Sequence, residues 1–371
     1  DVACVITFLD NTQEVIELDI KDFAPHTLYS VDVTELTNVE QISDIRLDYY
    51  LSNDTLLLDT QTKLGHDQVI YHRQDVLNVA QDTSSQPYII VDDADVLEVK
   101  QEDKVYSFNK NTGMLTQAVK GHRNILVGES ELCLWRAPID NDVQVRKLWE
   151  DAGYHDILTD VNHYSAHYLN NKDVELVFDL AVVSNAKARI MTGKVSWTIR
   201  NNGSINVKLE VNKNPRMPFL PRFGLVFKLQ DTFEALNYYG NGPYGAYQDK
   251  GVATYLSYFD TTVTRNFEPH ILPQENSSHN NTTYLQVSDH KYGFTFTSAE
   301  PMSFNASHYA VAQLTHATHN DRLEQEPITY VHIDKYQSGI GSNSCGPELA
   351  ERYRINDNDI HFEFNLQLNE Y

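Results

Sequence analysis

VSWTIRNNGSINVKLEV, residues 195–211, has the sequence of two β-strands joined by a tight turn. On both sides of the turn, β-branched and aromatic side chains recur among polar ones, as expected for strands with a buried face. The joint is RNNGS, residues 200–204, and its Asn-Gly pair tolerates the positive φ that a hairpin turn requires. The stretch therefore predicts an antiparallel β-hairpin.

Strand signals of this kind dominate the rest of the chain. They occur in VACVITFL (2–9), YIIVDDADVLEVK (88–100), FGLVFKL (223–229), YGFTFT (292–297), TYVHID (329–334) and IHFEFNLQL (360–368). Helical signals are few, namely VQVRKLWEDAG (143–153), which would end at Gly153, and HYAVAQLTHATH (308–319). Because strands do not alternate with helices, the pattern favours an all-β protein of antiparallel sandwiches over a (β/α)8 barrel or a dinucleotide-binding fold.

The length of 371 residues suggests more than one domain. A polar stretch with Ser and Pro, QDTSSQP at 81–87, predicts the boundary. Residues 1–80 then have the size of one small sandwich, and residues 88–371 suggest an extended double-sheet domain. The chain starts with Asp1 directly before a strand-like segment and has no initial Met, so we expect a piece of a longer protein.

The charge balance excludes two classes of partner. The chain has 52 acidic and 29 basic residues and a formal net charge of -23, whereas nucleic acids and anionic membrane surfaces attract basic patches. No segment approaches the roughly 20 apolar residues of a membrane span. The three cysteines, Cys4, Cys133 and Cys345, are far apart and form no CxxC pair, which indicates a reducing compartment. We therefore expect a cytoplasmic protein.

Tests for nucleophilic and metal chemistry leave alternatives open. There is no G-x-S-x-G motif, but SNSCGP (342–347) places Cys345 in a turn-like setting, as a nucleophile or as a small packed side chain. His316 and His319 would share one face of a helix, where packing competes with metal binding. No H-E-x-x-H motif accompanies them.

Two further stretches allow both a structural and a sugar-binding interpretation. DND, residues 140–142 within LWRAPIDND (134–142), lacks the Gly and distal Glu of a calcium loop. It predicts a structural turn, with a contact to a sugar hydroxyl as the alternative. NYYGNGPYGAYQDK (237–250) carries four tyrosines on a Gly/Pro-rich loop, for stacking on sugars or for packing. Glycoside hydrolysis needs a pair of carboxylates, and no pair can be selected among 52 acids.

Six motifs occur in an order that resembles one family closely. They are LWRAPIDND (134–142), WEDAG (149–153), YYGNGPYGAYQDK (238–250), PQEN (273–276), SHYAVAQLTHATHNDRL (307–323) and QSGIGSNSCGP (337–347). Together they resemble the C-terminal domain of β-galactosidases of glycoside hydrolase family two, and FNKNTGMLTQ (108–117) matches the opening hairpin of that domain. The resemblance implies an immunoglobulin-like β-sandwich over 1–80, followed by a large galactose-mutarotase-like β-supersandwich over 88–371.

The resemblance also implies where the chemistry lies. In this family the two catalytic Glu residues belong to a (β/α)8 barrel earlier in the sequence, and the Mg and Na ligands lie there and in preceding domains. We therefore expect no catalytic and no metal-binding residue in this chain. It would be the C-terminal part, or a separate small subunit, of a retaining β-galactosidase that acts on lactose-like galactosides, inactive without the barrel-containing part. Members of the family are often multimeric, so we expect a homo-oligomer.

The resemblance implies a substrate contact at one loop. Well-known members place a Trp there that stacks on the sugar, and the matching residue is Cys345. A thiol offers no aromatic platform, so the flanking Asn343 and Ser344 are the candidates for hydrogen bonds. Asn241 stands where the family usually has Arg, and His279 lies near the position of another Arg, which indicates a divergent member.

Two other functions remain as alternatives to the β-galactosidase interpretation. One is a stand-alone carbohydrate-binding module. The other is an aldose-epimerase-like enzyme that uses His308, His316 or His319.

Overall fold

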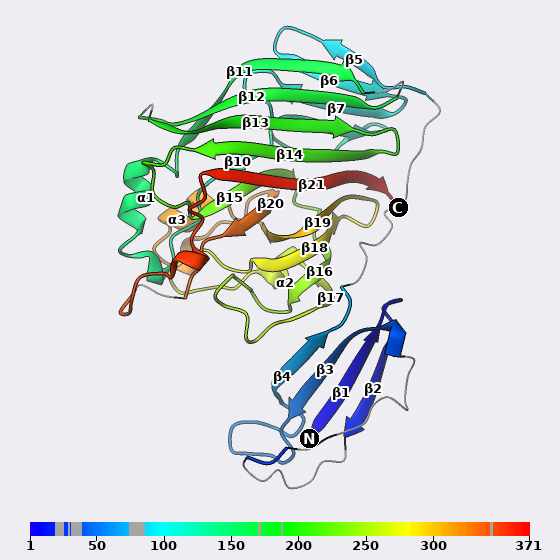
Figure 1. Cartoon of the computed structure of the whole chain (residues 1–371), viewed down its shortest axis with the longest axis vertical. Coiled ribbons are helices and arrows are strands. Elements are labelled where there is room, and N and C mark those ends of the chain that lie inside the picture. The colour runs from blue at the N-terminus through cyan, green and yellow to red at the C-terminus, as the bar shows by residue number, and fades with distance from the viewer. Residues whose placement is uncertain are drawn as a thin grey trace. The chain divides into compact units, whose positions relative to one another are not determined.

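The computed structural model describes residues 1–18, 26–28, 30, 39–73, 86–169, 172–186, 188–341 and 344–371 (Figure 1). The chain forms two compact units, Asp1–Leu77 and Asn78–Tyr371. Of the predicted boundary at 81–87, residues 81–85 lie outside the described ranges. The described elements are mainly antiparallel strands, which confirms the all-β class.

The first unit contains a four-stranded antiparallel sheet in the order β2-β1-β3-β4. Cys4, Ile6 and Ile42 form its buried cluster, and the strand predicted at 2–9 is confirmed as β1. The elements of this unit are β1 (Val2–Phe8), β2 (Gln13–Leu18), η1 (Val39–Gln41), β3 (Ile42–Tyr50) and β4 (Lys63–Ile70).

The described part of the second unit is built on two sheets. The smaller has five strands, β5 (Ile89–Asp92), β6 (Val96–Gln101), β7 (Lys104–Asn109), β8 (Leu115–Lys120) and β9 (Arg123–Asn124), in chain order. The larger has 12 strands, and its main path runs in the order β10-β15-β20-β19-β21-β14-β13-β12-β11. A branch leaves this path at β19, which pairs with β18, and continues through β16 to β17. These strands are β10 (Glu131–Cys133), β11 (Ile157–Tyr168), β12 (Val174–Ser184), β13 (Arg189–Ile199), β14 (Ser204–Lys213), β15 (Arg222–Gln230), β16 (Ala235–Gly242), β17 (Tyr255–Thr262), β18 (His279–Ser288), β19 (Tyr292–Ser307), β20 (Ile328–Gln337) and β21 (Asp359–Glu370).

One hydrophobic core joins the two sheets of the second unit. Along β12, buried residues alternate with half-buried ones, so one face of the strand faces the core. Phe108 of the small sheet packs against Trp197 of the large sheet, with ring centroids 5.3 Å apart. The Trp197 indole N–H donates to the carbonyl of Gly113, at 2.9 Å, so its polar atom is satisfied inside the core.

The hairpin predicted at 195–211 is confirmed as β13 and β14. Gly203 has φ of 83°, and its N–H donates to the carbonyl of Arg200, at 2.9 Å. On its other edge β14 pairs with the C-terminal strand β21. The other strands predicted within 88–368 are present as β5, β6, β15, β19, β20 and β21.

The helices are short. They are α1 (Arg146–Ala152), α2 (Val263–Asn266) and α3 (Val311–His316), with the 3-10 turns η2 (Asp140–Asp142), η3 (Asn320–Arg322) and η4 (Glu351–Tyr353). Gly153 ends α1 with φ of 76° and donates its N–H to the carbonyl of Glu150, as predicted. Helix α3 ends at His316, so His319 lies beyond it and the two histidines do not share a helical face. No helix in the described ranges is long and apolar enough to cross a membrane.

Candidate functional site

The loop predicted to meet substrate is presented to solvent. Ser344 and Cys345 are exposed, with Ser344 Oγ 3.9 Å from Cys345 Sγ. Asn343 lies outside the described residues. The interpretation of Cys345 as a packed side chain is wrong, because the thiol is exposed and free. Among the described residues, no histidine is hydrogen-bonded to this thiol, as a nucleophilic cysteine would require.

Asp249 anchors the segment that leads into this loop. Its carboxylate accepts the backbone N–H of Ile340, at 2.8 Å, and that of Gly341, at 2.7 Å. A Cβ on Gly339 would lie 2.5 Å from Asp249 Oδ2, so the close approach requires glycine. Both hydrogen bonds have a charged acceptor, which makes them stronger than neutral ones.

The LWRAPIDND segment holds the same part of the chain through other contacts. Arg136 is fully buried, donates to the carbonyls of Ser338 and Gly339, and pairs with Asp142. Asn141 Nδ2 donates to the carbonyl of Ile340, at 2.7 Å. Residues 140–142 form the 3-10 turn η2, and the buried Asp142 carboxylate accepts the backbone N–H of Ile139. The prediction of a structural turn is confirmed.

A cavity of about 400 Å³ lies beside this anchored segment. It is lined by residues from four parts of the chain: Ile139, Asp140, Asn141, Tyr247, Asp249, Lys250, Glu268, His270, Gln274, Glu275, Asn276, Ile340 and Gly341. Asp140 Oδ2 accepts from Gln274 Nε2, at 3.3 Å. Asp140 therefore holds Gln274, while Asp249 holds residues 340 and 341.

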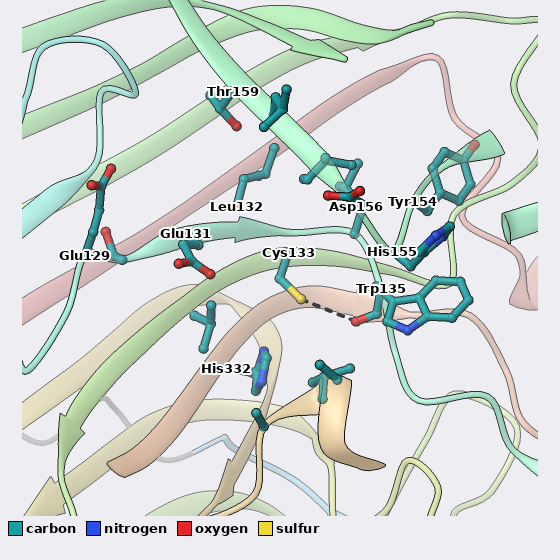
Figure 2. A pocket seen from close by; sticks show the side chains of 18 of the residues that line it. Glu129, Glu131, Leu132, Cys133, Trp135, Tyr154, His155, Asp156, Thr159 and His332 are labelled. Carbon is teal, nitrogen blue, oxygen red and sulfur yellow. Dashed lines mark hydrogen bonds between the residues drawn. The ribbon is translucent and has the colours of Figure 1, made fainter. Parts of the chain in front are cut away.

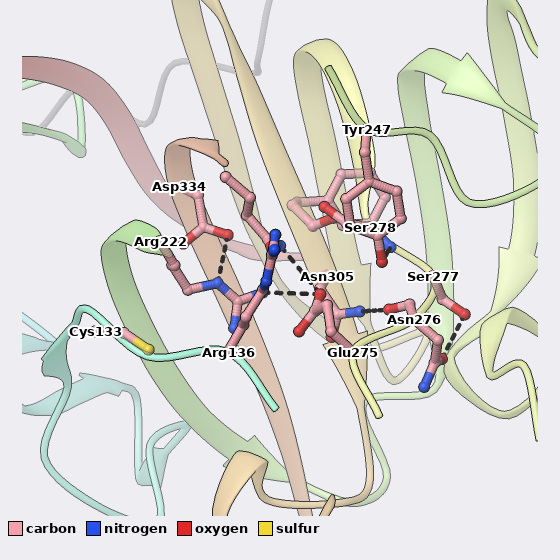
Figure 3. A network of polar contacts seen from close by, with 12 residues as sticks. Cys133, Arg136, Arg222, Tyr247, Glu275, Asn276, Ser277, Ser278, Asn305 and Asp334 are labelled. Carbon is pink, nitrogen blue, oxygen red and sulfur yellow. Dashed lines mark hydrogen bonds and ion pairs between the residues drawn. The ribbon is translucent and has the colours of Figure 1, made fainter. Parts of the chain in front are cut away.

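The PQEN motif contributes to a buried ionic network (Figure 3). Arg222 Nε lies 3.0 Å from Asp334 Oδ2, and Arg222 Nη2 lies 3.1 Å from Glu275 Oε1. Gln337 Nε2 donates to the same Glu275 oxygen, at 3.0 Å. Asn305 Nδ2 donates to the carbonyl of Asn276, at 2.5 Å. Glu275 and Asn276 of the motif therefore connect their loop to strands β15, β19 and β20.

Burial raises the pKa of Asp334 to about 7, although Arg222 opposes this, and the nearby charge of Glu275 raises the pKa further. Asp334 Oδ1 and Arg222 Nη1 are buried without hydrogen-bond partners in the described structure. Two carboxylates thus share one guanidinium in a site with little solvent. Asp334 is therefore the carboxylate whose pKa this arrangement raises.

The tyrosine-rich stretch is mostly packing. Tyr238, Tyr239 and Tyr247 are buried, and Tyr244 is exposed. The sequence predicts a loop here, but the first part of the stretch belongs to β16, which ends at Gly242. Strand pairing with β17 and β18 accounts for this difference.

The two departures from the family pattern, Asn241 and His279, touch each other. His279 Nδ1 lies 2.9 Å from the carbonyl oxygen of Asn241, which can only accept. The His279 ring is fully buried, with its centroid 4.6 Å from that of Tyr238 and 5.1 Å from that of Phe304. Burial lowers the pKa of His279 to about 4. A neutral packed ring therefore stands near the position where the resemblance implies an arginine.

Sequence reasoning missed Asp249 and the role of Arg136. Their partners in the 338–341 segment lie 91 to 203 positions away along the chain, so no local spacing indicates these contacts. For metals, no group of three or more His, Cys, Asp or Glu side chains in the described ranges is arranged to hold an ion.

Comparison with known proteins places the chain in a family. Residues 100–366 match the family described as Beta galactosidase small chain. The chain is 42% identical to beta-galactosidase of Staphylococcus xylosus over 369 residues, which are 99% of this chain and 37% of that protein. It is 31% identical to beta-galactosidase of Actinobacillus pleuropneumoniae over 345 residues, 92% of this chain and 34% of that protein.

The chain is also similar to the solved structure of galactose 1-epimerase from Lactobacillus acidophilus NCFM. That match has a TM-score of 0.39 and 9% identity, and it covers 78% of this chain and 99% of the other. The chain spans little more than a third of the two beta-galactosidases above. On the match over residues 100–366, it belongs to the beta galactosidase small chain family.

Proposed function

We propose that this chain is the C-terminal part of a retaining β-galactosidase that hydrolyses terminal β-D-galactosyl bonds, as in lactose. Its role is to complete an active site whose catalytic glutamates belong to a barrel-containing part outside this chain. Family membership supports the proposal, as does the greater length of relatives named beta-galactosidase. In this proposal the chain alone does not hydrolyse galactosides.

One observation carries the proposed role of the loop: exposed residues, Ser344 and Cys345, follow a hydrogen-bonded segment, residues 338–341. Arg136 holds the carbonyls of Ser338 and Gly339, and Asp249 holds the backbone N–H groups of Ile340 and Gly341. A group that must meet a substrate bound in another part needs such support, because a small displacement weakens its contacts.

Within the loop, Ser344 is the hydrogen-bonding candidate and Cys345 is the contact surface. The hydroxyl both donates and accepts, which suits a sugar hydroxyl. Asn343 is the third candidate by its position in the sequence. These residues would position substrate, and none is proposed as acid, base or nucleophile.

The partner in this proposal is the barrel-containing N-terminal part or large subunit. Mg and Na would be held by that part, and no step proposed here runs through a metal in this chain. We further propose a homo-oligomer in the cytoplasm.

An aldose-epimerase-like activity gains no support from the three histidines named for it. His308 Nε2 lies 2.8 Å from Glu234 Oε2, and His319 contacts Thr318. Of the three, His316 alone lines a second cavity, of about 860 Å³. The three side chains are therefore not gathered in one site.

The test is hydrolysis of a chromogenic β-galactoside by the chain alone and by the chain mixed with the separately produced barrel-containing part. We expect hydrolysis in the mixture only. Efficient hydrolysis by the chain alone, or none in the mixture, contradicts the proposal.

A further inference from the structure

A second and larger cavity lies away from the Cys345 loop. It has a volume of about 860 Å³ and includes residues of β10 and β11 in its lining. These two strands are the opposite ends of the path through the 12-stranded sheet. We call this cavity the seam pocket, because it lies where the two end strands approach each other. Its volume falls in the range of small-molecule sites, roughly 300–1,000 Å³.

His332 forms part of its wall (Figure 2). The side chain lies on β20 and is 4% exposed. Its Nδ1 atom is buried and has no hydrogen-bond partner in the described structure. Burial, together with the nearby charge of Arg222, holds the pKa of His332 well below its usual value, so the ring is neutral. A neutral imidazole has one donor and one acceptor nitrogen. An imidazole on the wall of a cavity, with Nδ1 lacking a partner, indicates a ligand that can donate or accept a hydrogen bond.

Two carboxylates on the wall are already oriented. Glu129 accepts from Asn109 Nδ2, at 3.0 Å, and from Thr112 Oγ1. Asp156 Oδ2 accepts from Asn185 Nδ2, at 2.8 Å. A carboxylate has about four lone-pair positions, so each retains acceptor capacity for hydroxyl groups of a ligand.

The charges of the lining exclude anionic ligands. Lys228 is paired with Glu131, and Arg146 Nε lies 2.7 Å from Glu150 Oε1. These pairs use both the lysine and the arginine of the lining, while the carboxylates Glu129, Asp156 and Asp160 remain without a cation there. A phosphate or carboxylate ligand would meet repulsion.

The remaining lining is a mixture of apolar and hydroxyl-bearing side chains. Trp135, Leu132 and Val311 supply apolar surface, and Thr159 supplies a hydroxyl group. Trp135 is fixed, because its indole N–H donates to Thr315 Oγ1, at 3.1 Å. Apolar surface between hydrogen-bonding groups matches a ring with apolar C–H faces and hydroxyl edges.

We propose that the seam pocket binds a neutral saccharide of one or two rings, as a site separate from the Cys345 loop. His332 would hydrogen-bond to a hydroxyl group of the sugar, and Glu129 and Asp156 would accept from others. The proposal does not depend on the β-galactosidase role, since it rests on the seam pocket alone.

The test is saturation-transfer NMR with the 371-residue chain and D-galactose or lactose, followed by titration calorimetry. His332→Phe keeps a ring of similar size but removes both nitrogens, and Glu129→Gln keeps an acceptor for Asn109. Each should weaken binding by about tenfold or more, the loss of one good hydrogen bond to a ligand. Asp260→Asn, a carboxylate-to-amide change at an exposed position of β17 outside the lining of the seam pocket, is the matched control and should leave binding unchanged.

Absence of saturation transfer at millimolar sugar overturns the proposal, as does unchanged binding in both seam-pocket variants. Stronger binding of galactose 6-phosphate or of tetramethylammonium than of galactose also overturns it. Because Glu129 is only partly buried, Glu129→Gln keeps the test decisive if His332→Phe does not fold. Hydrolysis in the mixture with the barrel-containing part should be retained by Glu129→Gln, which separates this inference from the proposed function.

Discussion

Arg136 and Asp142 form a two-point ion pair in the interior of the second unit. Arg136 Nη2 lies 2.8 Å from Asp142 Oδ1, Arg136 Nε lies 3.1 Å from Asp142 Oδ2, and the side chains are 0% and 6% exposed. The same guanidinium holds the carbonyls of Ser338 and Gly339. One buried pair thus connects the LWRAPIDND segment to the base of the Cys345 loop.

Breaking this pair should destabilise the protein strongly. Asp142→Asn leaves the buried Arg136 charge without its counter-ion, and loss of one partner of a buried pair costs about 3–5 kcal/mol. Urea unfolding followed by circular dichroism measures the change. Arg146→Met is the matched control, because the Arg146–Glu150 pair is partly exposed and should contribute about 0–1 kcal/mol. Equal effects of the two substitutions would show that the buried pair does not stabilise the loop base.

The Cys345 loop should matter for substrate and little for stability. Cys345 is exposed, so Cys345→Trp should change the free energy of unfolding by less than about 0.5 kcal/mol. In the mixture with the barrel-containing part, the indole should supply a stacking surface and lower KM for a β-galactoside. Steady-state kinetics checks this, with Ser344→Ala expected to raise KM. Unchanged KM in both variants would mean that the loop does not reach the substrate.

Asp334 should produce a pH-dependent stability. Its folded-state pKa of about 7 lies above the value for an unfolded chain. The folded state therefore binds the proton more tightly, and this stabilising contribution is fully present below about pH 4 and is lost as the pH rises through about 7. The loss is about 1.4 kcal/mol for each pH unit that separates the folded and unfolded pKa values. Asp334→Asn should remove this part of the pH dependence.

The measurement is the unfolding free energy of both proteins at several pH values between about 4 and 8. The difference between wild type and variant isolates Asp334 from the other titrating groups. A difference that does not change with pH would rule out the raised pKa.

Substitutions at two glycines distinguish the cost of a left-handed backbone conformation from the cost of a steric clash. Gly121 and Gly153 have φ of 62° and 76°, and a Cβ on Gly121 meets nothing within 4 Å. A Cβ on Gly153 would lie 2.4 Å from the Cβ of Ser184. Gly121→Ala should cost about 1–2 kcal/mol from the left-handed conformation, and Gly153→Ala about 1–3 kcal/mol more from overpacking. Thermal unfolding of the two variants tests this, and equal melting temperatures would refute the close contact at α1.

Sequence patterns predict the elements whose turns or ends are set by residues close to them in the chain. The hairpin at 195–211 and the end of α1 at Gly153 depend on a turn residue and its neighbours, and both are present. Residues 308–319 are less predictable, because only residues 311–316 form a helix. The segment from 235 to 242 is a strand through its pairing with β17 and β18, and no local signal reports those partners.

The sequence predicts only those residues of the site that belong to a recognisable motif. The resemblance leads to Cys345 and Ser344, and the turn at 140–142 follows from its Asp and Asn side chains. The contacts of Asp249 with Gly341 and of Arg222 with Asp334 join segments 92 and 112 positions apart. Spacing carries no information on such contacts, and sequence reasoning misses the wall of the seam pocket for the same reason.

Complementation tests most directly whether this chain completes an active site built elsewhere. A fixed amount of the barrel-containing part is titrated with this chain, and hydrolysis of a chromogenic β-galactoside is followed. We expect no hydrolysis by the chain alone and a rate that rises with added chain until it saturates at a fixed ratio of the two parts. Hydrolysis by the chain alone at a rate comparable with the mixture would place a catalytic carboxylate pair in these 371 residues and contradict the proposed function.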